Sequence, residues 1–200
     1  RNSLFERLIK TERAAGRTDF IGTLRKQGRM HPEVAEFPNK MFYQRERLQP
    51  VPCPHQEETT LGYDAPALDD RDEQLKTHRM IYVESPLCKR PGLSDKVNPA
   101  EAKIVADMVR RIHRFYGEHF DADKTVGVIV PYRNQIAMIR KQLELLDIPA
   151  LCSITIDTVE RYQGSQRDVI IYSFTVQNHY QLGFLAGNRF EEDGYVIDRK

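Results

Sequence analysis

The sequence predicts an α/β fold with a mostly parallel sheet and helices on both of its faces. Two observations support this prediction. In the second half of the chain, apolar stretches that suit strands alternate with amphipathic helical patterns, and strands joined through helices pair in parallel. Residues 126–130 also form a continuous apolar run, VGVIV, as expected of a strand buried on both faces.

Helices near the start of the chain are predicted from capping signals. Ser3 is a suitable N-cap, Glu6 follows three residues later, and apolar residues then recur at helical spacing until Gly16. A second helix is expected at residues 32–42, because Pro32 suits the first turn of a helix.

Helices in the second half carry stronger signals. Asn98, Pro99 and Glu101 form a cap, a first-turn proline and an acid at the third position. The apolar stripe of this helix consists of Ile104, Val105, Met108, Val109, Ile112, Phe115 and Tyr116. A further amphipathic helix is predicted at residues 133–146.

Strands are predicted at residues 20–24, 80–83, 126–130, 153–156 and 169–175. Residues 44–77 contain four prolines and many acids but little periodicity. They predict an exposed, irregular and poorly specified segment with one hairpin. We expect this excursion to extend over about residues 44–97 of an otherwise single domain covering residues 1–200.

Composition restricts the class of protein. The chain has 200 residues, 40% hydrophobic and 30% charged, with a net charge of +1, so any nucleic-acid-binding surface must be local. No signal peptide or membrane-length apolar run is visible. The three cysteines lack a C-x-x-C pair and predict reduced thiols in an intracellular protein, cytoplasmic in a bacterium or nuclear and cytoplasmic in a eukaryote.

Several catalytic motifs are missing. The chain contains no G-x-x-x-x-G-K-[ST] phosphate loop, no nucleophile elbow and no H-E-x-x-H. The spacing of the histidines suggests no metal site. By itself the chain therefore does not predict a complete nucleotide hydrolase.

Three polar loops follow predicted strands, at residues 27–31, 131–135 and 157–167. Ligands of parallel α/β sheets meet such loops, so we expect the three to lie along one rim. In the third loop, Thr158 and Gln163 suit phosphate and sugar contacts, Gly164 permits a positive φ, and Gln166 can bond a ribose hydroxyl. A solvated turn between strands is the alternative.

The other two loops each offer an arginine. Arg29 stands just before a helix start, where its planar guanidinium suits a phosphate clamp. In the second loop, Tyr132 offers a stacking face, and Arg133 lies in the first helical turn beside free backbone amides. The alternatives are an ordinary surface arginine and a strand-helix elbow with a packing tyrosine.

Five segments together resemble a known family. They are SLFERLIK, LRKQGRMHPEVAEFPNKMFY, VGVIVPYRNQIAMIRKQL, IDTVERYQGSQRDVIIYSF and GFL. They resemble the second RecA-like motor domain of superfamily 1 helicases, a P-loop NTPase fold. The resemblance covers about residues 1–49 and 98–185. It points to the 5'-to-3' branch that includes the RNA helicase of nonsense-mediated decay and the nuclease-helicase of Okazaki-fragment processing.

The resemblance implies roles at the ATP site. Arg29 matches the arginine that reaches the γ-phosphate and is the one catalytic residue expected in this chain. Gln27 matches the family's glutamine, and Gln166 occupies the position of the acid that contacts the ribose. Gly28 replaces the family's tyrosine near the adenine, which predicts weaker base recognition.

The resemblance also implies roles at a nucleic-acid strand. The residues that match the strand-binding motifs are Pro131, Tyr132, Arg133, Thr158, Gln163 and Asn178. The arginine of the family's R-x-N element is Val176 here. The expected partner is a single strand of nucleic acid, with DNA slightly favoured over RNA.

The resemblance further implies that the chain is part of a longer protein. ATP with Mg²⁺ would bind mainly to an upstream RecA-like domain that carries the phosphate loop, and the arginine-rich motif VI would begin near Arg199 and Lys200. The expected function is that of an ATP-dependent helicase or translocase of a DNA-repair type, inactive as this fragment alone. A degenerate, non-motor binding module and a nuclease-helicase fusion are the alternatives.

Overall fold

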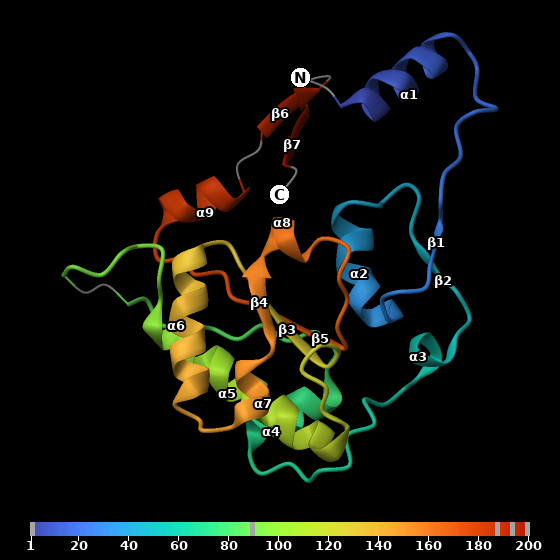
Figure 1. Cartoon of the computed structure of the whole chain (residues 1–200). Helices are drawn as coiled ribbons and strands as arrows, with labels where there is room; N and C mark the ends of the chain where they lie inside the picture. Colours follow the sequence, from blue (N-terminus) through green and yellow to red (C-terminus); the bar gives the residue numbers. More distant parts are fainter. Residues whose placement is uncertain (1–2, 89–90, 187–188, 193–194, 199–200) are drawn as a thin grey trace. The chain divides into compact units, whose positions relative to one another are not determined.

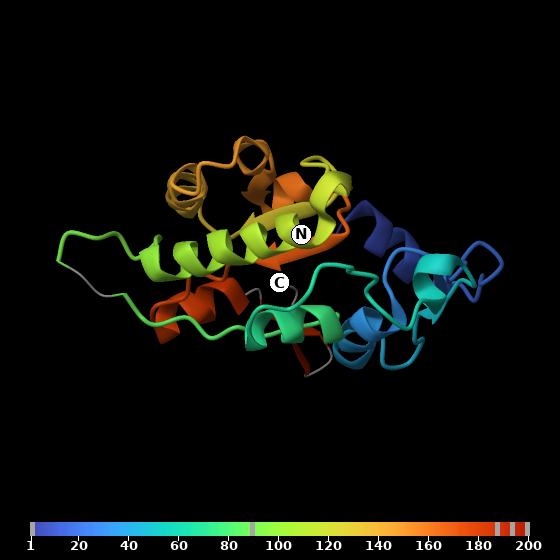
Figure 2. The ribbon, with the colours of Figure 1, turned by 90° about the horizontal axis from the view of Figure 1, so that it is seen from below.

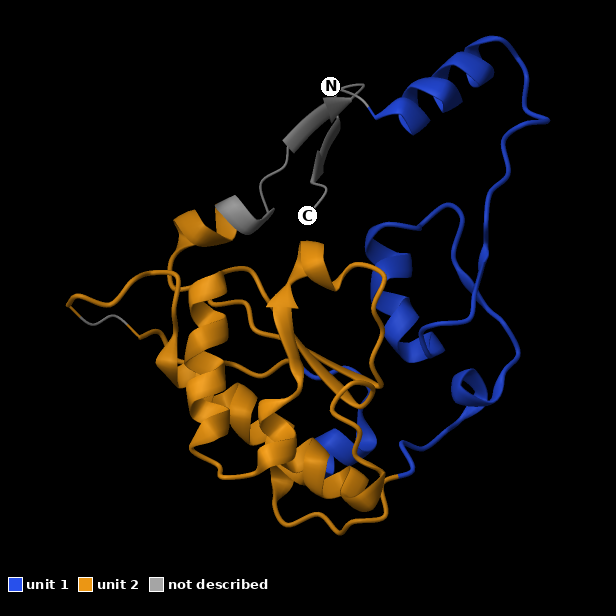
Figure 3. Ribbon diagram, viewed as in Figure 1, with its two compact units in different colours: residues 1–62, 73–81 blue, residues 63–72, 82–200 orange. Residues whose placement is uncertain are grey.

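The computed structural model describes residues 3–88, 91–186, 189–192 and 195–198 (Figure 1). The chain divides into two compact units, shown in Figure 3. Unit 1 comprises Arg1–Gly62 and Glu73–Ile81, and unit 2 comprises Tyr63–Asp72 and Tyr82–Lys200. The predicted start of motif VI at Arg199 and Lys200 lies outside the described residues.

Unit 2 is built on a three-stranded parallel sheet. The strands are β3 (Val126–Val130), β4 (Thr155–Thr158) and β5 (Val169–Tyr172), in the order β4-β3-β5. Parallel pairing with helices between the strands confirms the predicted α/β class. The prediction of a buried strand at residues 126–130 is also confirmed, because Val126, Val128 and Val130 are fully buried.

Helices cover this sheet. Helix α5 (Pro99–Tyr116) precedes the sheet. The helices between its strands are α6 (Arg133–Glu144), α7 (Pro149–Cys152) and α8 (Val159–Tyr162). The α5 and α6 helices lie side by side, and α6 contacts β3 and β4 (Figure 2). The predicted start of α5 is confirmed, since the Asn98 Oδ1 accepts from the amides of Ala100 and Glu101, both at 3.1 Å.

The remaining elements of unit 2 are short. They are η1 (Gly117–His119), α9 (His179–Ala186) and an antiparallel pair formed by β6 (Arg189–Glu192) and β7 (Tyr195–Asp198). The α4 helix (Asp70–Thr77) spans the boundary between the two units.

Unit 1 contains less regular structure. Its elements are α1 (Leu4–Ala14), β1 (Lys26–Gln27), α2 (Pro32–Met41), β2 (Gln49–Pro50) and α3 (Pro54–Glu57). The caps of the first two helices are confirmed: Ser3 Oγ accepts from the Glu6 amide at 3.1 Å, and Pro32 opens α2. The two strands pair in parallel, with Lys26 opposite Gln49.

Three sequence predictions about strands were wrong. Residues 20–24 and 80–83 form no strand, and the hairpin expected in residues 44–77 is replaced by the parallel pairing of β2 with β1. Phe20, Leu24 and Tyr82 are 81%, 90% and 82% exposed. An apolar β-prone run forms a strand only where a neighbouring strand can pair with it, and these runs lack one among the described residues.

Element boundaries also moved. The strand predicted at residues 153–156 begins at Thr155 instead, because Pro149 starts a helical turn that ends at Cys152. The strand predicted at residues 169–175 stops at Tyr172, and Thr175 has a φ of +53°, which extended backbone does not allow. The helix from Arg133 ends at Glu144 rather than at residue 146.

Residues 63–72 correct the prediction of a poorly specified excursion. Arg111 Nη1 of α5 bonds Asp69 at 2.6 Å and Asp72 at 2.7 Å, while Arg114 bonds Asp72 and the Pro66 carbonyl. Asp72 is only 1% exposed. Tyr63 stacks on Phe115 with ring centroids 5.1 Å apart. The segment is therefore bound to α5 by buried charge pairs and an aromatic stack.

No helix among the residues that the structure describes has both the length and the apolar composition needed to cross a bilayer.

Candidate functional site

Two of the predicted polar loops meet at one edge of the sheet in unit 2. Val130 ends β3 directly opposite Thr158, which ends β4, so the segments that follow both strands leave the same edge. This brings Pro131, Tyr132 and Arg133 to the same edge as Thr158. The expectation of a shared rim is confirmed for these two loops.

The first of these loops presents the start of α6. Tyr132 occupies the N-cap position without a side-chain capping bond, so the amides of Arg133 and Asn134 keep their donor capacity, while the Gln135 amide donates to the Tyr132 carbonyl at 3.0 Å. Arg133 is exposed and its guanidinium has no hydrogen bond or ion pair to any described residue. Burial raises the pKa of the Tyr132 phenol, which therefore stays a neutral hydrogen-bond donor. The loop thus offers amides, a cation and a phenol to a ligand.

The second loop is anchored by a tyrosine. Tyr162 is 5% exposed and packs against Gly127, the second residue of β3. A Cβ at Gly127 would overlap the Tyr162 hydroxyl and ring. Arg167 packs at 5.7 Å from the centre of the same ring and donates to Thr155 Oγ1 at 3.0 Å. The glycine in the buried strand is therefore explained by the docking of this loop.

The polar residues around this anchor point outward. Gln163 and Gln166 are exposed, and their side-chain amides have no partner among the described residues. Thr158 occupies the N-cap position of α8, but its hydroxyl makes no capping bond. Gly164 has a φ of +85°, which confirms the predicted positive φ. The side chains predicted to meet a strand are thus free to do so.

Asn178 follows β5 and has a local structural role. Its Oδ1 accepts from the Gln181 amide at 2.9 Å and so caps the start of α9. One face of its amide remains for a ligand, because the Nδ2 group has no partner among the described residues. The assignment of Asn178 to strand binding stays a prediction.

The third polar loop lies in unit 1 and is held by amide side chains. Gln27 Oε1 accepts from the Met30 amide at 2.7 Å and the Arg29 amide at 3.0 Å, and Gln27 Nε2 donates to the Met30 carbonyl at 2.7 Å. Gln56 Nε2 donates to the carbonyls of Gln27 and Met30, and His55 Nε2 donates to the Gly28 carbonyl at 2.6 Å. The side chain of Gln27 is therefore used to shape the loop.

Arg29 is presented by this loop without being held. It is exposed, and its guanidinium has no hydrogen bond or ion pair within the described part of the chain. Beside it, a Cβ at Gly28 would meet only Val51 Cβ, at 4.0 Å. The position leaves room for a larger side chain, so the absence of the family's tyrosine is not forced by packing.

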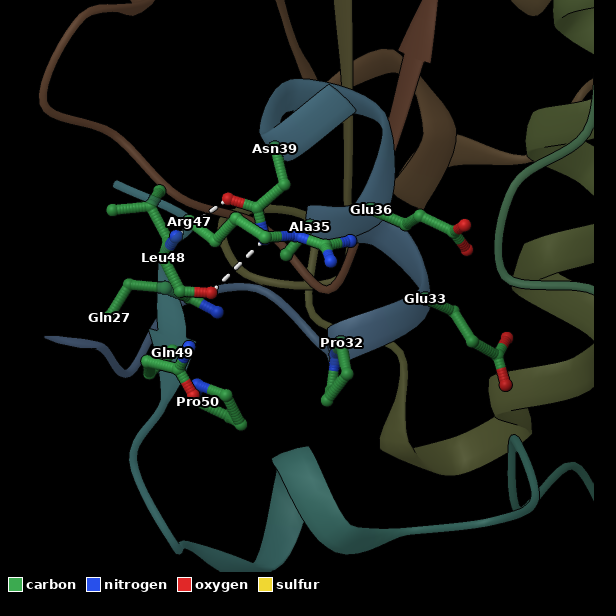
Figure 4. A pocket seen from close by; sticks show the side chains of 10 residues that line it. All are labelled: Gln27, Pro32, Glu33, Ala35, Glu36, Asn39, Arg47, Leu48, Gln49 and Pro50. Atoms are coloured by element: carbon green, nitrogen blue, oxygen red, sulfur yellow. Dashed lines mark hydrogen bonds between the residues drawn. The ribbon is translucent and has the colours of Figure 1, made fainter. Parts of the chain in front are cut away.

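A pocket of about 410 Å³ lies next to this loop in unit 1 (Figure 4). It is lined by Gln27, Pro32, Glu33, Ala35, Glu36, Asn39, Arg47, Leu48, Gln49 and Pro50. Asn39 reaches from α2 to the backbone of Leu48, with bonds of 3.1 and 2.7 Å. Arg29 is not among the lining residues, whereas Gln27, which is also predicted at the ATP site, is one of them.

Sequence reasoning missed a set of buried polar side chains in unit 2. Its members are Glu101, Gln135, Gln177 and Gln181, each 7% exposed or less. The available signal was a polar residue among the apolar residues of α5 and α6, but Glu101 and Gln135 both meet Ser173, which lies 72 and 38 residues away in the chain. Through these side chains, the starts of α5 and α6 are bonded to each other and to the segment that follows β5.

No group of three histidine, cysteine or acidic side chains that could hold a metal ion occurs among the described residues. Cys53 Sγ lies 3.8 Å from His55 Nε2, but that nitrogen is already bonded to the Gly28 carbonyl.

Comparison with known proteins places the chain in a family. A family model described as an AAA domain matches residues 1–190. The chain is 27% identical over 198 residues to DNA polymerase alpha-associated DNA helicase A of Saccharomyces cerevisiae, an alignment that covers 94% of this chain and 27% of that protein.

Two further relatives are similar over most of the chain. One is the DNA replication ATP-dependent helicase/nuclease DNA2 of Xenopus laevis, 26% identical over 88% of this chain and 17% of that protein. The other is Regulator of nonsense transcripts 1 of Dictyostelium discoideum, 27% identical over 94% of this chain and 13% of that protein. The chain thus spans between 13% and 27% of the length of these three relatives.

Proposed function

Because the chain belongs to the AAA domain family and carries the second RecA-like domain of superfamily 1 helicases, we propose that it is part of an ATP-dependent helicase or translocase. In this proposal, unit 2 grips a single strand of nucleic acid, and Arg29 completes an ATP site whose phosphate loop belongs to another RecA-like domain. Cycles of ATP hydrolysis open and close the cleft between the two domains and move the strand.

The edge of the sheet in unit 2 carries the proposal for strand binding. The first turn of α6 offers the free amides of Arg133 and Asn134, and Arg133 also offers a cation, both of which suit a phosphate. Thr158 and Gln163 add uncapped polar groups from the neighbouring loop, and Tyr132 adds an aromatic face for a base. Backbone contacts of this kind fix a strand without reading its sequence.

The loop that presents Arg29 supports the proposal for ATP. Phosphoryl transfer needs little covalent chemistry from the protein, and a guanidinium that reaches the γ-phosphate stabilises the charge of the transition state. Hydrogen bonds from the side chains of Gln27, His55 and Gln56 fix the backbone of the loop and leave that guanidinium unpaired among the described residues. ATP would bind with Mg²⁺, which neutralises phosphate charge, and Gln166 would bond the ribose.

Three departures from the family favour a second candidate, a non-motor binding module. Gly28, Gln166 and Val176 replace a stacking tyrosine, a ribose-binding acid and a strand-binding arginine. In either case we place the protein inside the cell, where its nucleic-acid partner lies. The partner is single-stranded, with DNA slightly favoured over RNA.

The deciding experiment measures ATP hydrolysis by the full-length protein with and without single strands. We expect stimulated turnover, and a loss of about a hundredfold or more with Arg29→Ala, as removal of such an arginine causes. Arg25→Ala is the matched control, because Arg25 is an exposed arginine of the same unit whose side chain has no described partner. Wild-type protein that binds strands but never hydrolyses ATP would establish the binding module instead.

A further inference from the structure

A buried carboxylate joins the start of α5 to the segment that follows β5. Glu101 is 7% exposed, and its Oε1 accepts from Ser173 Oγ at 2.6 Å and from the Thr175 amide at 2.9 Å. Its Oε2 accepts from Ser85 Oγ at 3.2 Å. Bonds to an ionised acceptor are stronger than those between neutral groups, so this carboxylate can fix the backbone that it binds.

The backbone that Glu101 binds is strained. Thr175 has a φ of +53° and is completely buried. A β-branched residue rarely adopts this left-handed conformation, which costs about 1–3 kcal/mol and persists only where the surroundings enforce it. The bond from its amide to Glu101 is one of those enforcing contacts. The turn at Thr175 sets the direction of the chain that reaches Asn178 three residues later.

A second buried amide connects the same network to α6. Gln135 is fully buried, and it accepts from the Asn98 amide at 2.8 Å and donates to the Asn98 carbonyl at 3.1 Å. Its Nε2 also lies 3.4 Å from Ser173 Oγ. Gln135 stands two residues after Arg133, so the network holds the loop with the proposed phosphate contact as well.

Two more glutamines hold the opposite side of the network. Gln177 accepts from the Cys88 amide at 3.0 Å and donates to the Val97 carbonyl, and Gln181 donates to the Asp95 carbonyl at 2.5 Å. Gln181 Oε1 also accepts from the Gln177 amide at 2.8 Å. Cys88, Asp95 and Val97, which belong to the excursion that the sequence left unexplained, thus bind the glutamines on both sides of Asn178.

From these contacts we infer that Glu101 is a positioning residue for strand binding, which holds the segment from Ser173 to Asn178 in register with the start of α6. This inference rests on the proposed function. Packing alone does not require the carboxylate, because apolar side chains of similar volume often stabilise a core equally well. A fully bonded polar network instead fixes one geometry, and here that geometry brings two strand-binding segments together.

The test measures the affinity of the full-length protein for a fluorescent single strand, together with strand stimulation of its ATP hydrolysis. We expect Glu101→Ala to weaken binding at least about fivefold and to reduce stimulation, while hydrolysis without a strand stays close to wild type. Glu101→Gln should recover most of the affinity, since the amide oxygen can accept from Ser173 and Thr175. Arg133→Ala shows how much strand affinity is lost when a proposed direct phosphate contact is removed, for comparison with Glu101→Ala.

Two further variants keep the test decisive. Glu118→Ala removes an exposed carboxylate of η1 that lies outside the network and should change neither readout. If Glu101→Ala does not fold, Ser173→Ala removes one donor and should weaken binding in the same direction. If Glu101→Ala lowers the thermal stability but leaves the strand affinity unchanged, the inference is overturned and the proposed function is not. Wild-type protein that neither binds strands nor hydrolyses ATP overturns the proposed function with it.

Discussion

In unit 2 the polar loops leave a sheet whose central strand is buried, whereas in unit 1 the polar loop leaves a strand of two residues. The buried apolar side chains of unit 2 include seven residues of α5 and the three valines of β3. In unit 1, Ala35 and Leu75 are the buried apolar side chains among the described residues. The loop of Arg29 is therefore shaped by side-chain amides rather than by a hydrophobic core.

This difference shows which polar loops can change their conformation at a small cost in free energy. Loops on a buried sheet inherit its rigidity, because moving them disturbs close-packed side chains. A loop held by a few hydrogen bonds opens at a smaller cost in free energy, since each such bond contributes only about 1 kcal/mol. The proposed phosphate contact of Arg29, which would have to form and break in each cycle, suits the second arrangement.

The largest expected effect is in the core of unit 2. Gly127→Ala places a methyl group where Tyr162 packs, and overpacking at such a site lowers the free energy of unfolding by about 3 kcal/mol. Chemical denaturation measures this loss. Gly183→Ala is the control, because a Cβ there meets nothing within 4 Å. Equal stability of the two variants would show that the Tyr162 anchor is not fixed as described.

A smaller effect is expected in unit 1 from Gln56→Leu. This change removes both amide donations to the Arg29 loop and should speed hydrogen exchange of residues 27–31 about tenfold, the factor that corresponds to roughly 1.4 kcal/mol. Global unfolding should change little. Gln44→Leu serves as the control, because Gln44 is exposed and bonds only the Lys40 carbonyl. Unchanged exchange would mean that the loop has another support.

Acid should release residues 63–72 from α5. The Arg111 guanidinium, with the Asp72 amide, lowers the pKa of Asp69 to about 2. Burial alone raises the pKa of Asp72, but the Leu68 amide and the Arg111 and Arg114 guanidiniums outweigh it and hold that pKa below its ordinary value. Folded pKa values below the unfolded ones stabilise unit 2 above about pH 4, and this contribution is lost as the pH falls towards 2.

Arg111→Met should remove much of this dependence. We expect its acid unfolding midpoint to rise by about one pH unit, because the paired carboxylates lose their common partner. Arg110→Met is the control, since among the described residues Arg110 binds only the half-exposed Asp107. An identical midpoint in wild type and Arg111→Met would place the acid-sensitive contacts elsewhere.

The smallest effect concerns the base of the nucleotide. Gly28→Tyr restores an aromatic ring at a position with room for it, and stacking worth about 1 kcal/mol should lower the KM for ATP about fivefold. Steady-state kinetics of the full-length protein measure it. Gly28→Ala separates the ring from the change in backbone freedom, so equal KM values for the two variants would argue against stacking.

The sequence by itself determined the local features of this protein. Ser3, Pro32 and Asn98 mark helix starts correctly, because a cap acts on amides within four residues in the chain. The strand at residues 126–130 was predicted because its apolar run is continuous. The shared position of the loops after β3 and β4 was predicted from the alternation of strands and helices, since parallel strands end at one edge.

Only the tertiary structure decided which distant groups meet. Tyr162 selects glycine at position 127, and Glu101 meets Ser173 across 72 residues of chain. The exposed runs near Phe20 and Tyr82 became no strands, because pairing depends on a neighbour that local sequence does not specify. Periodicity and caps report on the nearest turn, whereas burial and register depend on contacts that exist only once the chain has folded.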